Sequence, residues 1–175
     1  KKEAEKKAVM DNAADFYQKG LDAWDNQQVT AAFDLQARAL AILKPYWAEN
    51  NMYSFNGKDL LLDNSILGEL QHMANTIDLS VDPAKVVLSL DNDFEVVCTI
   101  KATDSENGKN LAAVPVAYRF QSGSGLNRGE KTTGNDGEVK VGISNPDLTR
   151  TYHELETSVD LIELFDPRAL DTDLR

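Results

Sequence analysis

The sequence contains few of the residues on which metal and nucleophilic chemistry depend. Its 175 residues include one cysteine, Cys98, and two histidines, His72 and His153. A single cysteine excludes an internal disulfide, and the sequence has no CxxC or HxxxH spacing of the kind found in zinc sites. We therefore expect no cofactor and no enzymatic activity.

An excess of positive charge and long apolar runs are also missing. Lys and Arg number 18 against 29 Asp and Glu, which gives a net charge of -11. Nucleic acids and anionic membranes both bind cationic surfaces, so we expect neither as a partner. No apolar run is long enough to span a bilayer, and we expect no direct membrane insertion. No signal-peptide pattern is present either, so any signal or lipid anchor is expected to lie outside this sequence.

Glycine is scarce in the first part of the chain and more frequent in the second. Three of the ten glycines lie before residue 81, and the other seven lie after it among alternating β-branched residues. Helical periodicity followed by strand alternation predicts an α+β fold in two parts. We expect a small helical bundle over residues 1–80, an antiparallel β-sandwich over 84–165 and a tail over 166–175.

Three helices are predicted in the first part. They run from about Glu3 to Asp25, from about Val29 to Lys44, where Pro45 stops the helix, and from about Lys58 to Ile77. The short polar link between the first two helices favours an antiparallel hairpin. The expected buried stripes are Ala4, Ala8, Ala14, Tyr17, Leu21 and Trp24 in the first helix, Val29, Ala32, Phe33, Gln36, Ala39, Leu40 and Leu43 in the second, and Leu60, Leu61, Ile66, Leu67, Leu70, Met73, Ala74 and Ile77 in the third.

The first helix pair resembles a tetratricopeptide-type unit. The segment AADFYQKGLDAWDNQQVTAAFDLQARALAILKP carries Gly20 late in the first helix, Ala32 and Ala39 in the second, and a closing proline. Small residues at these positions would allow the two helices to approach closely. Gln36 stands where such units have a large apolar residue. Only one pair is present, so an extended peptide-binding superhelix is not implied.

The second part predicts short antiparallel strands joined by polar turns. Strands are expected at 85–90, 94–102, 114–120 and 138–143, with one or two more between Tyr152 and Leu164. In the second of these strands Phe94, Val96, Cys98 and Ile100 should share the buried face, and Tyr118 should point inward from the third. The stretch SGSGLNRG at 122–129 is expected to be a flexible inter-strand loop.

The pieces TDSENGK, AVPVAYRF, QSGSG and KTTGNDGEVKV occur in the order found in bacterial immunoglobulin-like repeats of the invasin and intimin kind. The second part therefore resembles such a domain. A tetratricopeptide-like pair followed by this domain is similar to bacterial envelope lipoproteins of the LPP type. That resemblance implies a secreted protein, lipid-anchored at a cysteine not present here, in a periplasmic or outer-membrane-associated location.

Four aromatic residues within ten positions are the main candidate binding residues: Tyr46, Trp47, Tyr53 and Phe55. Outside a clear helix, such a cluster could form an exposed anchor for a partner. The alternative is that these side chains fill a seam between the helices and the sandwich, and we favour the seam.

Other polar residues give weaker signals. Cys98 lies on the apolar face of a predicted strand and is expected to be a buried core thiol. His72 and His153 are expected to be ordinary solvated histidines. Asp91 and Asp93, with a third carboxylate from a nearby loop, could form a weak calcium site, although polar turn residues are the commoner explanation.

Taken together, these features favour a non-catalytic protein-interaction or spacer module of a bacterial cell-envelope protein. Its expected partner is another envelope protein or a second copy of the chain. The alternative is a carbohydrate- or peptidoglycan-binding β-sandwich module, although the second part contains no tryptophan and only Tyr118 and Tyr152 as tyrosines.

Overall fold

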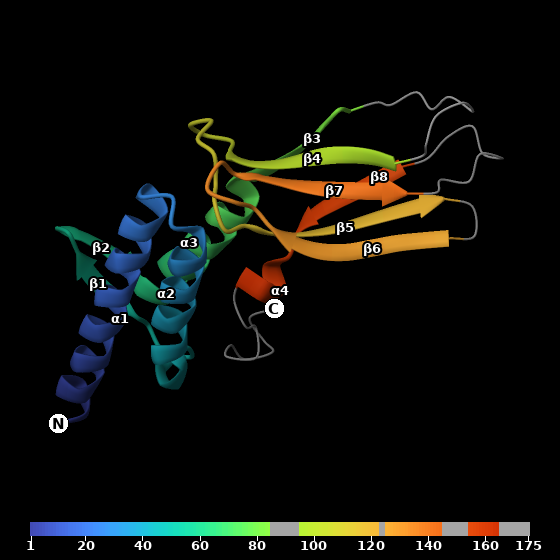
Figure 1. Ribbon diagram of the computed structural model, residues 1–175. Coiled ribbons are helices and arrows are strands. Elements are labelled where there is room, and N and C mark those ends of the chain that lie inside the picture. The colour runs from blue at the N-terminus through green and yellow to red at the C-terminus, as the bar shows by residue number, and fades with distance from the viewer. Residues whose placement is uncertain (85–94, 123–124, 145–153, 165–175) are drawn as a thin grey trace. The chain divides into compact units, whose positions relative to one another are not determined.

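The computed structural model describes residues 1–84, 95–122, 125–144 and 154–164. The chain forms two units (Figure 1): unit 1 contains Lys1–Thr76 together with the described residues Leu161–Leu164, and unit 2 is Ile77–Asp160. The composition shift placed the change of structure near residue 80, and the two units divide at 76/77. The strand expected at 85–90, Phe94 and the tail at 166–175 lie outside the described residues.

Two helices form the largest contact within unit 1. Helix α1 is Lys2–Asp25 and helix α2 is Val29–Ile42, close to the predicted bounds. All seven residues predicted for the buried face of the second helix are buried. The first helix differs at its start, because Ala4 and Ala8 are exposed. With 24 residues against 14, α1 is longer than α2, and burial along α1 begins only at Met10.

The aromatic-rich connection contains a β-hairpin that the sequence analysis missed. After the 3-10 turn η1 (Lys44–Tyr46), strand β1 (Met52–Phe55) pairs antiparallel with β2 (Lys58–Leu61). Asn56 and Gly57 form the turn with φ angles of 49° and 79°. Two successive positive φ values are typical of the type I′ turn, which suits the twist of a two-residue hairpin.

The predicted start of the third helix at Lys58 is therefore wrong. Helix α3 is Leu62–Thr76, and Ile77 begins a strand instead of ending the helix. Leu62, Ile66, Leu70 and Met73 form its buried face, while Leu61 is exposed. The short helix α4 (Leu161–Leu164) adds the buried Leu164 to unit 1. A strand had been expected to continue to that residue.

Unit 2 contains two three-stranded antiparallel sheets. The first has the order β3-β4-β7, formed by Ile77–Asp82, Glu95–Asp104 and Glu138–Ser144. The second has the order β6-β5-β8, formed by Gly125–Thr132, Pro115–Ser122 and Glu154–Val159. Four of these strands, β4, β5, β7 and β8, overlap predicted strand regions. The fold is thus α+β, with three N-terminal helices followed by antiparallel strands.

Two strands of unit 2 correct the sequence analysis. Strand β3 lies mostly in the region assigned to the helical bundle, which was expected to end at residue 80. Strand β6 was assigned in large part to a loop, yet Gly125–Thr132 pairs with β5 along its whole length. It is an edge strand, and its sequence GLNRGEKT gives almost no apolar alternation.

Each sheet of unit 2 has side chains buried on one face. Cys98, Ile100 and Val141 are buried in the first sheet, and Val116 and Phe120 in the second. Val97, between Val96 and Cys98, is 50% exposed, as the predicted alternation requires. Tyr118 is only partly buried and lies over Gly129 of the neighbouring strand. A Cβ atom at residue 129 would lie 2.6 Å from the tyrosine Oη.

A lysine joins the two sheets at their edges. Strand β6 is the edge of its sheet and β7 is the edge of the other. The Lys131 Nζ of β6 donates a hydrogen bond to the main-chain carbonyl of Lys140 in β7, at 2.9 Å. A side chain, and not a backbone ladder, thus makes this contact.

Candidate functional site

All four predicted aromatic residues belong to unit 1, and each is partly buried. The Trp47 Nε1 donates a hydrogen bond to the carbonyl of Leu40 in α2, at 3.2 Å. The Tyr53 hydroxyl donates to Asp11 Oδ1 in α1, at 2.8 Å. The ring centroid of Phe55 lies 5.0 Å from that of Tyr17, within the range of a favourable aromatic pair. These contacts attach the aromatic segment, defined as residues 46–55, to the first two helices.

The Tyr53–Asp11 contact also changes the acidity of both groups. The pKa of Asp11 is lowered, first by the hydrogen bond from Lys7 and then by that from Tyr53. The pKa of Tyr53 is raised because its hydroxyl donates to this carboxylate. The bond is thus one between a neutral phenol and an ionised carboxylate at neutral pH.

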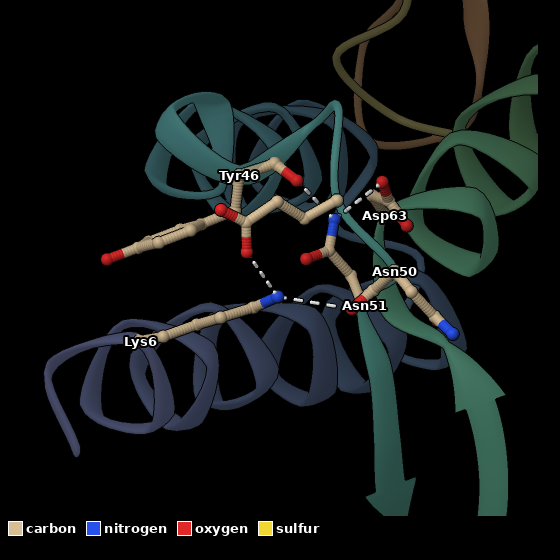
Figure 2. A network of polar contacts seen from close by, with 6 residues as sticks. Lys6, Tyr46, Asn50, Asn51 and Asp63 are labelled. Atoms are coloured by element: carbon tan, nitrogen blue, oxygen red, sulfur yellow. Dashed lines mark hydrogen bonds and ion pairs between the residues drawn. The ribbon is translucent and has the colours of Figure 1, made fainter. Parts of the chain in front are cut away.

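Lys6 of α1 holds the beginning of the aromatic segment (Figure 2). Its Nζ lies 2.8 Å from Glu49 Oε2 and donates a second hydrogen bond to the Asn50 carbonyl at 3.1 Å. The same ammonium group lies 5.5 Å from the centroid of the Tyr46 ring, in the geometry of a cation–π contact. The hydrogen bond from Lys6 lowers the pKa of Glu49.

Asn51 is the buried centre of the same network. The residue is 1% exposed. Its Nδ2 donates hydrogen bonds to the Tyr46 carbonyl at 2.8 Å and to Asp63 Oδ2 at 2.9 Å (Figure 2). Its main-chain carbonyl accepts a hydrogen bond from the Leu62 N–H at 3.0 Å. Asn51 therefore ties the 3-10 turn to the start of α3, with the hairpin between them.

The outward face of the hairpin carries an apolar pair. Met52 and Leu61 lie directly opposite one another in the β1–β2 register, and they are 55% and 37% exposed. The alternation of strand side chains places them on the face opposite Tyr53 and Phe55. Sequence analysis missed this pair, although the Asn-Gly turn between two short alternating runs was the signal that could have found it.

The other candidate residues have simpler environments. Cys98 is 6% exposed; burial, and then the nearby charge of Asp82, raises the pKa of its thiol. This matches the expected core thiol. His72 is an exposed residue of α3. His153, Asp91 and Asp93 lie outside the described residues, so the histidine and calcium expectations that involve them stay predictions.

Asp104 shows why an acidic residue in a turn is not necessarily a ligand. It is 5% exposed, and its carboxylate accepts hydrogen bonds from the Glu106 N–H and from Asn107 Nδ2, both at 2.9 Å. Among the described residues, no group of three or more His, Cys, Asp or Glu side chains could hold a metal ion. No helix in the described part of the chain has the length and apolarity needed to cross a membrane.

A hollow lies on the sheet β6-β5-β8 of unit 2. It was not anticipated from the sequence, because β6 was expected to be largely a loop and β8 is distant in the chain from the consecutive strands β5 and β6. Its floor and walls include the outward positions of all three strands. Across the sheet these positions form two rows, Arg128–Arg119–Glu156 and Glu130–Ala117–Ser158. The small side chain of Ala117 leaves the centre of the second row open.

Comparisons with protein-family models, curated proteins and solved structures gave no match.

Proposed function

We propose that the chain is a non-catalytic protein-interaction or spacer module of a bacterial cell-envelope protein. The observation that carries this proposal is the exposed Met52–Leu61 pair on a hairpin whose other face contacts α1 through Tyr53 and Phe55. Large apolar side chains on an ordered surface are favourable anchors, because binding them releases water at little cost in conformational entropy. The partner is another envelope protein or a second copy of the chain.

The finer architecture forms part of the same proposal. We infer that α1 and α2 are a tetratricopeptide-like pair and that unit 2 is an immunoglobulin-like sandwich of the invasin and intimin kind. The absence of space for a Cβ atom at Gly20 supports the first inference, since that glycine lies against Gln36 of α2. The two antiparallel sheets with one buried face each support the second. The proposed location is periplasmic or outer-membrane-associated.

The aromatic side chains have a different part in this proposal from that of the hairpin pair. The side chains of Trp47, Tyr53 and Phe55 contact α1 or α2, so they mainly support the hairpin. Replacing them would disturb unit 1 itself and would not test binding cleanly. Substitution of the outward pair is the sharper experiment.

The proposal is tested by site-specific photo-cross-linking in envelope extract, with a photoreactive amino acid at position 52 or 61. The control places it at Asp34, an exposed residue of α2. An interaction module is supported if positions 52 and 61 capture the same protein and the control does not. This capture should also be lost when the other residue of the pair is changed to serine. Capture that is identical from position 34 would refute a specific surface on the hairpin.

Self-association is tested separately by sedimentation of the purified chain over a range of concentrations. A dimer that dissociates on double substitution Met52→Ser and Leu61→Ser would identify a second copy as the partner. Because both side chains are exposed, the double variant should retain the circular dichroism spectrum and thermal stability of the parent.

The second candidate is a carbohydrate- or peptidoglycan-binding module. The observation in its favour is the hollow on β6-β5-β8, whose walls carry both acidic and basic side chains. Peptidoglycan contains peptides as well as sugars, and the two components present different chemistry. Retention of the chain on insoluble peptidoglycan, compared with retention on chitin, would test this candidate.

A further inference from the structure

The positive and negative side chains in the two rows of the hollow are not all paired with one another. Arg119 and Arg128 lie directly opposite one another on neighbouring strands, and like charges in this relation repel. On its other side Arg119 is paired with Glu156, with 3.0 Å between Nε and Oε2. This ion pair neutralises Arg119, and Glu156 is not paired with Arg128.

Strand β6 therefore presents two charges of opposite sign that are not paired with one another. Neither Arg128 nor Glu130 forms an ion pair with any residue in the described part of the chain. Both are exposed, and they are two positions apart on the same face of one strand. At about 3.3 Å per residue, their Cα atoms are separated by roughly 6.6 Å.

This spacing defines the ligand to which the hollow is complementary. An extended peptide places side chains i and i+2 on one face at the same separation. A carboxylate on one and an ammonium on the other would meet Arg128 and Glu130 together. The guanidinium favours a carboxylate, because its N–H groups can donate two parallel hydrogen bonds.

We propose that this hollow binds a short, extended peptide that carries an acidic and a basic side chain two residues apart. Ala117 allows the peptide to approach the floor, and the Ser158 hydroxyl at the opposite wall can donate to or accept from its main chain. The proposed peptide site shares no residue with the hairpin of unit 1. The two proposals can therefore be tested separately.

Two other ligand classes fit the hollow less well. A purely anionic ligand would face two glutamates as well as two arginines, so the net charge of these walls does not favour it. A sugar is usually held by stacking on an exposed aromatic ring. The Tyr118 side chain lies over Gly129, and strand alternation places it on the face opposite Arg119. The remaining wall residues are aliphatic, polar or charged.

The test is a ¹H–¹⁵N NMR titration of the full chain with acetyl-Lys-Ala-Glu-amide as the probe. Acetyl-Gln-Ala-Gln-amide is the matched neutral control, and an oligomer of N-acetylglucosamine tests the sugar alternative. We expect saturable shifts at the amides of 117–119, 128–130 and 156–158 and at the Arg128 Nε–H. The affinity should weaken as salt is raised, because the groups involved are exposed charges.

The variant Arg128→Gln should reduce the affinity at least tenfold, while Arg38→Gln, an exposed arginine of α2, should leave it unchanged. A charge swap, Arg128→Glu with Glu130→Arg, keeps the total charge and should reverse the preferred order, so that acetyl-Glu-Ala-Lys-amide binds better. Equal shifts with the neutral peptide, no saturable shift with the charged one, or a response only to the sugar would each overturn the proposal.

Discussion

Replacement of Gly20 by alanine tests whether the approach of α1 to α2 depends on a missing side chain. Gly20 is buried in α1, and a Cβ atom there would lie 2.5 Å from Gln36 Nε2 and 2.7 Å from its Cδ. Gln36 is fully buried in α2, and its Nε2 donates to the Tyr17 carbonyl at 3.1 Å. The added methyl group must therefore displace a side chain that is already bonded and enclosed.

Two opposing free-energy changes decide the outcome. Alanine is favoured over glycine within a helix by about 1 kcal/mol. Displacing Gln36 overpacks the helix contact, which typically costs about 1–3 kcal/mol. It also breaks the bond to Tyr17 and leaves a buried amide without a partner, at a cost of about 1–3 kcal/mol. We expect Gly20→Ala to lower the free energy of unfolding of unit 1 by about 1–5 kcal/mol.

The same substitution should change sign when its obstacle is removed. In the Gln36→Ala background, Gly20→Ala should stabilise by about 0.5–1 kcal/mol through helix propensity. The coupling between the two positions is then at least about 1.5 kcal/mol. Gly68→Ala in α3 is a matched control, because no atom lies within 4 Å of a Cβ atom there. It should stabilise in the otherwise unchanged chain.

Urea unfolding followed by tryptophan fluorescence measures this effect, because both tryptophans, Trp24 and Trp47, belong to unit 1. The double-mutant cycle needs the single variants, the double variant and the parent. If Gly20→Ala stabilises the parent by as much as it stabilises the Gln36→Ala variant, the contact does not constrain the helix pair. The reasoning about close approach would then be refuted.

Three further predictions concern buried and paired polar groups. Asn51→Ala should lower the stability of unit 1 by about 1–3 kcal/mol, because it removes the donor to Tyr46 and Asp63, whereas Asn50→Ala, measured in the same urea unfolding, should change it by less than about 0.5 kcal/mol. Because the pKa of Glu49 is lowered in the folded chain, its ion pair contributes stability above the ordinary pKa of 4.5, and this contribution is lost as the pH falls through the folded pKa. The stability difference between the parent and Glu49→Gln should therefore be present at pH 7 and disappear at low pH. A difference that persists when the carboxyl is protonated would exclude the ion pair as its source. The buried Cys98 thiol, with its raised pKa, should react with a disulfide reagent at neutral pH many times more slowly in the native chain than in urea, and equal rates would show that it is accessible.

Strong periodicity explains which elements could be predicted from the sequence. The first two helices are long, and α2 buries every residue of its predicted face. The boundary of α3 was missed because Lys58–Leu61 is compatible with a helix when considered by itself. The turn geometry at Asn56 and Gly57 pairs these residues with β1 instead. Local helix preference was overridden by the hairpin.

Edge strands explain much of what was missed in unit 2. A central strand such as β5 buries Val116 and Phe120, which produces a visible alternation. The edge strand β6 carries Arg128, Gly129 and Glu130 in its middle, and its pairing is provided by the backbone. Backbone hydrogen bonds depend little on the side chain, so this strand has a weak signature in the sequence.

The candidate sites were only partly predictable for a related reason. The aromatic cluster is contiguous in sequence and was found by counting, whereas the residue that holds it, Lys6, is 43 positions from Glu49. The hollow of unit 2 combines strands whose outward residues look like ordinary solvated charges when each is considered alone. Their relation becomes visible only through the register.

The Lys131–Lys140 hydrogen bond bears on whether the edge of β7 can pair with a strand of another molecule. A strand at the margin of a sheet offers main-chain groups that can recruit a strand from another molecule, and lysines are common in natural proteins at such places. Here the ammonium group already occupies the Lys140 carbonyl that an incoming strand would need. Replacing Lys131 should therefore lower the melting temperature only slightly. The main effect should be a greater tendency of the chain to polymerise as its concentration rises.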